Sequence, residues 1–374
     1  MRFTLSSSAL SSRLSTLSKV INSKNALQIL DCFLFEVANN TLSITASDSE
    51  NVMKSTLALD ECDGEGKFAV NNRTILDAVK ELPEQPLTVD VDINSLAIKM
   101  IYQNGLYNFT GQDAGTYPLV QPISGEVSSL SMPSSILSDN ITRSIFATAS
   151  EELRPVMNGI YFDLTNEALA IVASDGHKLV RNRNFSIKTD VPKSFILPKK
   201  PANLLKNVLG KDDSEVQIRF DERNAEIVFA DTVLQCRLIE GRYPNYNSVI
   251  PQNNPNQLTI DRKVLIGALR RVLPFASESS QLVRLHLETG KLEISSEDID
   301  FSTSAKEEIT CDYSGVNMNI GFKGTSLNDI LNNLASNEVE LQLADPSRPC
   351  LIIPCEQPEN EDVLMLIMPM LLND

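Results

Sequence analysis

The segment SDGH contains the residues best suited to acid–base or nucleophilic chemistry, namely Ser174, Asp175 and His177. A hydrolase needs a nucleophile, a base and a third group that orients the base. An aspartate and a histidine two residues apart on a turn rarely provide that pair, and the matching earlier segment SDSEN has no histidine. The second histidine, His286, falls in an expected strand. We therefore expect no catalytic residues and no enzymatic activity.

Cofactor and metal chemistry have little support in the sequence. It contains no phosphate-binding loop, no glycine-rich dinucleotide turn, no nucleophile elbow and no cluster with metal-ligand spacing. The six cysteines are dispersed and form no CxxC pair, which favours reduced, mostly buried thiols. We expect no cofactor, no ATP and no metal.

The length and composition indicate a globular protein of two or three domains. The chain has 374 residues, 42% hydrophobic and 22% charged, with a net charge of −16. No apolar run is long enough to cross a bilayer, and the N-terminal segment lacks the apolar stretch of a secretion signal, so we expect a cytoplasmic protein. Taken alone, the negative charge counts against a nucleic-acid partner.

One sequence unit occurs three times. The segments VANNTLSITASD, LTNEALAIVASD and LETGKLEISSED align with one another, at residues 37–48, 164–175 and 287–298. Each ends on an aspartate, which we expect to end a strand by binding its own turn backbone. Helix-like stretches precede and follow each copy, and strands with a period of two come after them. The helix-like windows are residues 8–24, 71–82, 133–150, 198–211, 261–276 and 323–337.

Each third therefore predicts two helices packed on one face of antiparallel strands, which is an α+β unit. The expected domains are residues 1–122, 128–251 and 256–374, with connectors near Pro122 to Ser128 and near Pro251 to Asn256. Repetition alone leaves open a duplicated fold that forms no ring.

The charge is unevenly distributed along the chain. The six helix-like windows hold 15 basic and five acidic residues, although acidic residues outnumber basic ones by 49 to 33 in the whole sequence. In the fifth window, Leu265 and Leu269 share one side with Ala268 and Val272, which leaves Lys263, Arg270 and Arg271 facing away. Basic helices without aromatic clusters suit non-specific contact with duplex phosphates. Exposed lysine and arginine also serve solubility, and that explanation competes at each single position.

The sequence resembles the bacterial DNA polymerase III beta subunit, the DNA sliding clamp, along essentially its whole length. The motifs that carry the resemblance are MRFTL, ITASD, MNGIYFD, VASDGHKLV, EGRYPNY, DYSGVNMNIGF and LIMPM. The resemblance implies three clamp domains per chain and a head-to-tail homodimer. Six domains then form a ring around double-stranded DNA, with the helices inside and the sheets outside. It further implies a non-catalytic processivity factor.

The resemblance also implies particular contacts with DNA. The matched positions are Lys24, Arg73, Lys80, Arg154, Lys199 and Lys200, and the charge bias of the helices adds Lys206 and Arg270. Pro155 and Val156 stand where the family often has two tyrosines.

A peptide pocket between the second and third domains is implied in the same way, for the replicative polymerase, the clamp loader and repair polymerases. The matched residues are Met157, Ser174, Gly176, His177, Lys178, Leu179, Pro244, Val249, Met368, Pro369, Met370 and Leu371. Methionines suit a pocket that accepts several partners. Lys178, Ser248 and Ser326 differ from the residues frequent in the family.

The implied dimer interface consists of Tyr107 and Phe109 on the first domain and Pro274 and Phe275 on the third. Core packing is an alternative account of these residues and of the terminal LMLIMPM. A second hypothesis for the whole protein is a repeat scaffold that binds proteins through its acidic sheets and never contacts DNA.

Overall fold

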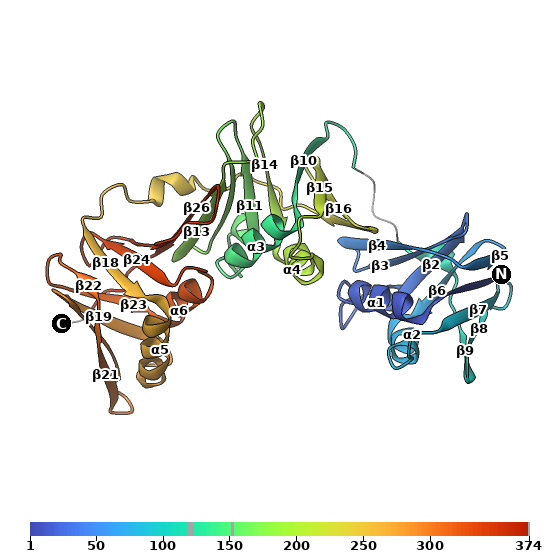
Figure 1. The fold of residues 1–374 in the computed structure, drawn as a ribbon, viewed down its shortest axis with the longest axis horizontal. Helices are drawn as coiled ribbons and strands as arrows, with labels where there is room; N and C mark the ends of the chain where they lie inside the picture. Colours follow the sequence, from blue (N-terminus) through green and yellow to red (C-terminus); the bar gives the residue numbers. More distant parts are fainter. Residues whose placement is uncertain (119–122, 151–152, 373–374) are drawn as a thin grey trace. The chain divides into compact units, whose positions relative to one another are not determined.

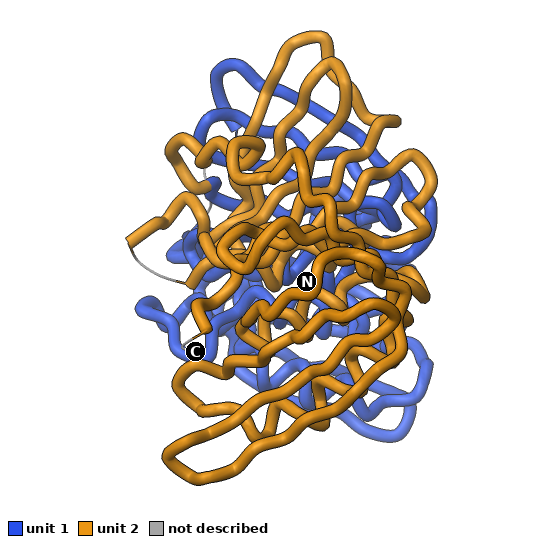
Figure 2. Tube along the Cα trace, turned by 90° about the vertical axis from the view of Figure 1, so that its left-hand side faces the viewer, with its two compact units in different colours: residues 1–138, 203–238 blue, residues 139–202, 239–374 orange. Residues whose placement is uncertain are grey.

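The computed structural model describes residues 1–118, 123–150 and 153–372 (Figure 1). Two compact units make up the chain, residues 1–138 with 203–238 and residues 139–202 with 239–374 (Figure 2). Their limits follow continuous sheets, so each unit combines parts of two sequence repeats. The three-domain boundaries stay a prediction, and Pro122, at the end of the first expected domain, lies outside the described residues.

Each sequence repeat contains two helices, as predicted. The helices are α1 (Ser7–Leu17), α2 (Asn72–Val79), α3 (Ser134–Ile145), α4 (Lys199–Val208), α5 (Arg262–Val272) and α6 (Gly324–Asn332). Ser6, Asn71 and Asp261 cap three of them by accepting a hydrogen bond from the backbone N–H three residues on. No helix within the described ranges is long and apolar enough to span a bilayer.

The first unit contains two antiparallel sheets. The five-stranded sheet has the order β5 (Glu61–Asp63), β1 (Arg2–Ser6), β7 (Pro86–Asp92), β8 (Ala97–Tyr102) and β9 (Gly105–Thr110). The eight-stranded sheet has the order β10 (Ser128–Pro133), β15 (Glu215–Phe220), β16 (Asn224–Phe229), β17 (Thr232–Arg237), β4 (Asn51–Ala58), β3 (Thr41–Ser47), β2 (Cys32–Ala38) and β6 (Gly66–Asn71).

The second unit also contains two sheets. The nine-stranded sheet has the order β14 (Lys193–Pro198), β11 (Gly159–Leu164), β12 (Leu169–Ser174), β13 (Lys178–Asn184), β26 (Glu361–Ile367), β25 (Cys350–Pro354), β24 (Glu338–Leu343), β18 (Asn256–Asp261) and β22 (Asp312–Tyr313). The four-stranded sheet has the order β21 (Thr303–Thr310), β20 (Lys291–Asp298), β19 (Leu282–Glu288) and β23 (Met318–Lys323).

Successive repeats are joined by pairing between two strands. In the first unit β17 of the second repeat pairs antiparallel with β4 of the first, and we call this pairing the first joint. In the second unit β26 of the third repeat pairs antiparallel with β13 of the second, and this is the second joint. Each joint turns two half-sheets into one continuous sheet, so that strand edges are paired.

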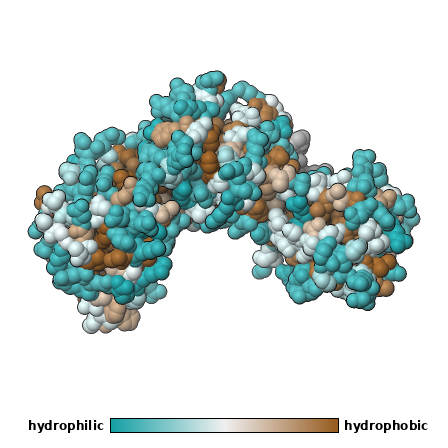
Figure 3. All heavy atoms as spheres, in the orientation of Figure 1, coloured by the Kyte–Doolittle hydropathy of each residue, from teal (hydrophilic) through white to brown (hydrophobic). Residues whose placement is uncertain are grey.

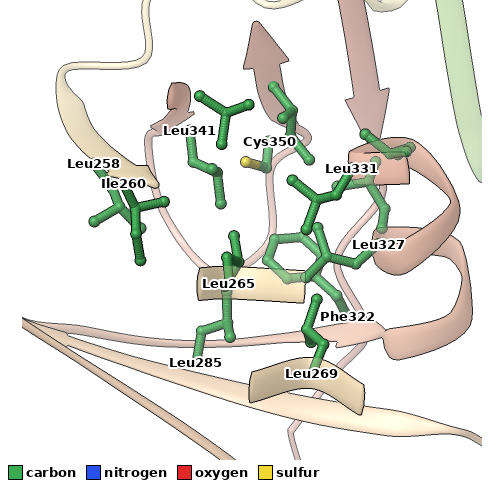
Figure 4. Packing of buried hydrophobic residues seen from close by; sticks show 14 of the residues in the cluster. Leu258, Ile260, Leu265, Leu269, Leu285, Phe322, Leu327, Leu331, Leu341 and Cys350 are labelled. Atoms are coloured by element: carbon green, nitrogen blue, oxygen red, sulfur yellow. The ribbon is translucent and has the colours of Figure 1, made fainter. Parts of the chain in front are cut away.

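The apolar faces of the helices form the cores. Leu265 and Leu269 of α5 meet Leu327 and Leu331 of α6, with Phe322 beside them, and all five are buried (Figure 4). The predicted buried side of the fifth window is therefore confirmed. Lys263, Arg270 and Arg271 are exposed on its other side, also as predicted. On the face drawn in Figure 3, hydrophilic residues cover most of the surface between smaller hydrophobic patches.

A buried polar cluster fastens β26 to α3 at the second joint. The Glu361 carboxylate accepts hydrogen bonds from the Asn140 amide at 2.8 Å and from the Arg143 guanidinium. The side chains of Arg143 and Glu361 are only 14% and 7% exposed. Removing one member of a buried pair leaves the other charge desolvated and unpaired.

We predict that Glu361→Ala lowers the free energy of unfolding by about 3–5 kcal/mol, because Arg143 then keeps a largely buried charge with only the exposed Asp139, 4.0 Å away, as a partner. The measurement is a urea titration of the full chain. Glu359→Ala, at a neighbouring exposed glutamate, is the matched control and should change stability by no more than about 0.5 kcal/mol. Equal stabilities of the two variants would contradict the assignment.

Candidate functional site

The SDGH segment forms a tight turn between β12 and β13 and carries no catalytic arrangement. The Asp175 carboxylate accepts hydrogen bonds from the backbone N–H groups of His177 and Lys178, both at 2.9 Å. Gly176 has φ +90°, which a residue with a side chain rarely adopts. Asp175 thus ends a strand by binding its turn backbone, as predicted, and Asp48 and Asp298 do the same in the other repeats.

Electrostatics favour the ionised form of this aspartate. Burial raises the pKa of Asp175, but the Lys178 ammonium and the two backbone N–H groups outweigh that effect and hold the pKa below its usual value. The ammonium lies 2.5 Å from the carboxylate. The Lys178 ammonium therefore pairs within its own turn.

Several residues predicted for the peptide pocket meet around this turn. Lys178 and Leu179 pair with Ile367 and Leu366 across the second joint. The Met368 N–H donates to the His177 carbonyl at 2.8 Å, which ties the end of β26 to the turn. Met368 is 37% exposed and presents an apolar side chain at this rim.

Other predicted pocket residues differ in their surroundings. Met157 and Ser174 are buried, and the Ser174 hydroxyl donates to the Lys178 carbonyl at 2.8 Å. Val249 is 50% exposed on the short 3₁₀ turn Tyr246–Val249 that follows the exposed Pro244. These residues bring polar turn groups and apolar side chains to one region of the second unit.

The last predicted pocket residues continue along another sheet. The Met370 N–H donates to the Gly321 carbonyl on β23 at 2.8 Å. Leu371 is 86% exposed and lies at a hollow on the four-stranded sheet, together with Arg284 and His286. The structure therefore places Met370 and Leu371 beside β23 and Met368 at the turn.

An apolar cluster at this joint was not predicted from the sequence, apart from Leu179 and from the core packing considered for LMLIMPM, which contains Leu364 and Leu366. Its further members come from both sides of the second joint and from the connector after β17: Tyr161, Val172, Tyr243, Ile250, Leu351, Leu364 and Leu366. The rings of Tyr161 and Tyr243 stack at 4.6 Å. The signal was the uninterrupted run VLMLI at 363–367, which puts apolar side chains on both faces of β26 instead of one.

The predicted DNA contacts are largely exposed cations on or beside helices. Arg73, Lys206 and Arg270 are exposed on α2, α4 and α5. Lys199 and Lys200 are half-buried at the start of α4. Lys80 is the C-cap residue that ends α2, and its ammonium lies 2.8 Å from the Asp77 carboxylate. Lys24 lies beyond α1, which ends at Leu17.

The helices are shorter than the windows, yet they stay basic. Within the six observed helices there are ten basic and three acidic residues. Some of the cations are bound internally: Arg13 pairs with Asp231 at 2.9 Å, and Arg262 donates to the Ser336 carbonyl at 2.7 Å. Arg271 likewise binds Glu307. The cation excess in the helices is smaller than in the windows because the helices are shorter, and part of the remaining excess stabilises the fold.

Arg154 differs from the other predicted DNA contacts in its location. It precedes the short 3₁₀ turn Pro155–Met157, and its guanidinium lies over the Gly176 turn, 3.1 Å from the position a Cβ of that glycine would take. Val156 packs against the apolar cluster of the second joint. Arg154 thus belongs spatially to the rim of the predicted pocket.

The residues predicted for the dimer interface lie on or near open sheet edges. Tyr107 and Phe109 are on β9, the last strand of the five-stranded sheet. Pro274 and Phe275 are exposed just after α5, which packs against β21, the edge strand of the four-stranded sheet. Within the described part of the chain, neither β9 nor β21 has a second neighbouring strand.

Three successive α+β repeats with basic helices are the arrangement expected of a clamp protein of DNA replication. The comparisons with known proteins agree. Residues 1–121, 131–245 and 247–371 match the N-terminal, central and C-terminal domains of the DNA polymerase III beta subunit. The chain therefore belongs to the DNA polymerase III beta-subunit family, as the resemblance predicted.

Full-length relatives and solved structures support the same assignment. The beta sliding clamp of Pseudomonas aeruginosa is 28% identical and covers 99% of this chain and 100% of its own length. A crystal structure of the P. aeruginosa sliding clamp bound to griselimycin has a TM-score of 0.93 at 25% identity, with both chains covered completely. The Thermotoga maritima beta subunit gives 0.90 at 26%, again with complete coverage. The protein is a DNA sliding clamp of DNA polymerase III and is not an enzyme.

Proposed function

We propose that two copies of this chain close head to tail into a ring around double-stranded DNA. The ring holds the replicative polymerase, the clamp loader and repair polymerases through short peptide motifs. The observation that carries the proposal is the pair of open strands, β9 and β21. Each joint within the chain pairs the last strand of one repeat with the fourth strand of the preceding repeat. The last strand of the first repeat, β9, and the fourth strand of the third, β21, have no such partner among the described residues.

The ladders give the position of Tyr107 relative to its counterparts in the other repeats. In each repeat we start from the first of its last three strands and move twice to the residue paired on the neighbouring strand. The second move reaches the last strand of the repeat, which is β9, β17 or β26. The three paths are Val89–Met100–Tyr107, Ile218–Ile227–Leu234 and Leu341–Ile352–Met365. Tyr107 therefore takes the place of Leu234 and Met365.

The same counting applies to the other side of each joint. Ala46, Ala173 and Ser296 are aligned in the repeated segment, and across their hairpins they face Met53, Val180 and Ala305. Leu234 faces Met53 at the first joint, and Met365 faces Val180 at the second. By equivalence, Tyr107 of one copy faces Ala305 of the other.

This register predicts a specific cross-link. In a chain whose accessible Cys62 and Cys355 are serine, Tyr107→Cys with Ala305→Cys should form intermolecular disulfides on mild oxidation, since directly opposed Cβ atoms lie about 4.5–5.5 Å apart. Non-reducing electrophoresis would show a covalent dimer or larger closed species.

The matched control is Tyr107→Cys with Lys306→Cys, because adjacent residues of a strand point to opposite faces. Efficient cross-linking of the control pair, or none with the first pair, would contradict the register.

Topology and a basic lining together account for sliding on DNA. Exposed cations on the helices, including Arg73, Lys206 and Arg270, would face phosphates without reading sequence. A closed ring needs no tight contact, so screened and water-mediated phosphate interactions suffice. The acidic remainder of the chain would disfavour other contacts with nucleic acid.

We predict that protein placed on DNA by its clamp loader stays on closed circular DNA and leaves the same DNA after linearisation. Gel filtration of labelled protein with each DNA measures retention. Replacing Arg73, Lys206 and Arg270 together with glutamate should lower the loaded fraction, because the lining then repels phosphates.

Equal retention on circular and linear DNA would contradict topological binding. No effect of the triple charge reversal would favour the alternative of a scaffold that never contacts DNA.

The pocket at the second joint would supply partner recognition. Exposed Met368 borders the turn at Gly176, and exposed Val249 directly precedes Ile250 of the apolar cluster of the second joint. Apolar anchors in such a pocket dominate the binding energy of a short peptide.

We predict that Val249→Asp weakens binding of a fluorescent peptide carrying the clamp-binding segment of the replicative polymerase at least about tenfold, or 1.4 kcal/mol. A charge at the apolar rim would have to be desolvated. Fluorescence anisotropy gives the affinity, and Val191→Asp, at a valine 60% exposed elsewhere in the second unit, is the control. Equal affinity of both variants would overturn the pocket assignment.

A further inference from the structure

A hollow of about 710 Å³ lies on one face of the first joint. Both sides of the joint and the segment after β9 contribute to it. Its apolar surface comes from Leu34, Val52 and Val233, with the buried Tyr117 at the side. A volume of this size is typical of ligand sites, which usually measure about 300–1,000 Å³.

The hollow is the repeat counterpart of the apolar cluster at the second joint. Leu34, Thr45 and Val52 align with Tyr161, Val172 and Leu179 in the repeated sequence. Across the joint, ladder counting aligns Glu226, Val233 and Gln235 with Leu351, Leu364 and Leu366. Tyr117 and Tyr243 occupy the two connectors, each followed by proline.

Two substitutions change the character of the site. Leu351 and Leu366 fill the second joint with apolar side chains, whereas Glu226 and Gln235 stand at these positions in the first joint. The first joint therefore keeps an open hollow with apolar walls and polar groups at the base. Such a mixture suits a ligand with both apolar and charged side chains.

Of the acidic groups at the hollow besides Glu36, Glu226 is paired with a cation, whereas Asp113 is held only by a backbone N–H and keeps its charge. Glu226 accepts from Arg219 at 2.9 Å and from the Gln235 amide at 3.0 Å. The Asp113 carboxylate accepts from the Gly115 N–H at 3.0 Å.

The Glu36 carboxylate binds two ammonium groups, those of Lys54 at 3.5 Å and Lys67 at 2.5 Å. Burial raises the pKa of Glu36, but the two lysines more than offset this and keep it below its usual value. Within this cluster of three side chains, one carboxylate shared by two lysines leaves one positive charge in excess. Because Lys54 and Lys67 are 45% and 63% exposed, that charge is accessible to a ligand.

We propose that this first-joint hollow is a second docking site for an extended peptide with apolar side chains flanked by acidic ones. The apolar side chains would contact Leu34, Val52 and Val233, and the carboxylates would bind Lys54 and Lys67. The proposal rests on the proposed binding of partner peptides at the second joint and adds a second site, at the first joint, that prefers acidic peptides. It does not depend on ring closure, since a single chain contributes every lining residue.

The probe is a fluorescein-labelled peptide, Asp-Ser-Leu-Ser-Leu-Ser-Asp, whose aspartates and leucines share one face when it is extended, titrated into the full chain carrying Val249→Asp to weaken the second-joint pocket. Methyl NMR spectra should show shifts of Val52 and Val233. The doubly changed Lys54→Gln, Lys67→Gln chain should bind at least about tenfold more weakly, a loss of 1.4 kcal/mol. Glu36→Gln should bind more tightly, because it removes the competing carboxylate.

Lys99→Gln, at an exposed lysine on β8, is the control and should leave the affinity unchanged. The charge-reversed peptide Lys-Ser-Leu-Ser-Leu-Ser-Lys should bind more weakly than the acidic one. Shifts confined to Leu179 and Leu366, equal affinity for both peptides, or no binding at millimolar concentration would each overturn the proposal. If the protein bound this peptide but was not retained on closed circular DNA, the result would count only against the proposed ring and not against this docking site.

Discussion

Antiparallel pairing between strand edges is the interaction on which the rest of this structure depends. An edge strand exposes a row of unpaired N–H and C=O groups and tends to recruit another strand. Twice within the chain that tendency is satisfied by the next repeat, at β4–β17 and at β13–β26. Among the described residues, two edges of the same kind, β9 and β21, have no second neighbouring strand, and we propose that their pairing closes the three repeats into a ring with a second copy.

Charge separation complements this arrangement. The net charge of −16 would oppose DNA binding if it were spread evenly. Instead, the observed helices hold ten of the basic residues and three of the acidic ones. Some of these cations have a structural role, such as Arg143 in the buried pair with Glu361. Others, such as Arg270, stay exposed on the polar side of an amphipathic helix whose other side packs in the core. One helix thus contributes to both the core and the surface that we propose to face phosphates.

Much of the fold could be predicted from the sequence because the signals are local. The repeated ASD and SED segments predicted the strand ends at Asp48, Asp175 and Asp298, and the helical spacing of Leu265 and Leu269 predicted the buried side of α5. Helix ends were harder to predict from the sequence. Helix α1 ends at Leu17, before the β-branched pair Val20 and Ile21 and the polar Asn22, all weak helix formers. The window to residue 24 therefore counted Lys19 and Lys24 as helical.

The joints could not be predicted from local patterns, because they depend on which distant strand meets each edge and in what register. For the same reason the side chains that face one another across a joint, such as Leu179 and Leu366, were only partly recognised. The measurement that tests ring closure most directly is electron microscopy of the purified full-length protein. The account predicts class averages of a closed ring with a central hole wide enough for duplex DNA, built from two copies. Particles that remain single arcs without a hole, at concentrations where light scattering shows one chain per particle, would contradict it.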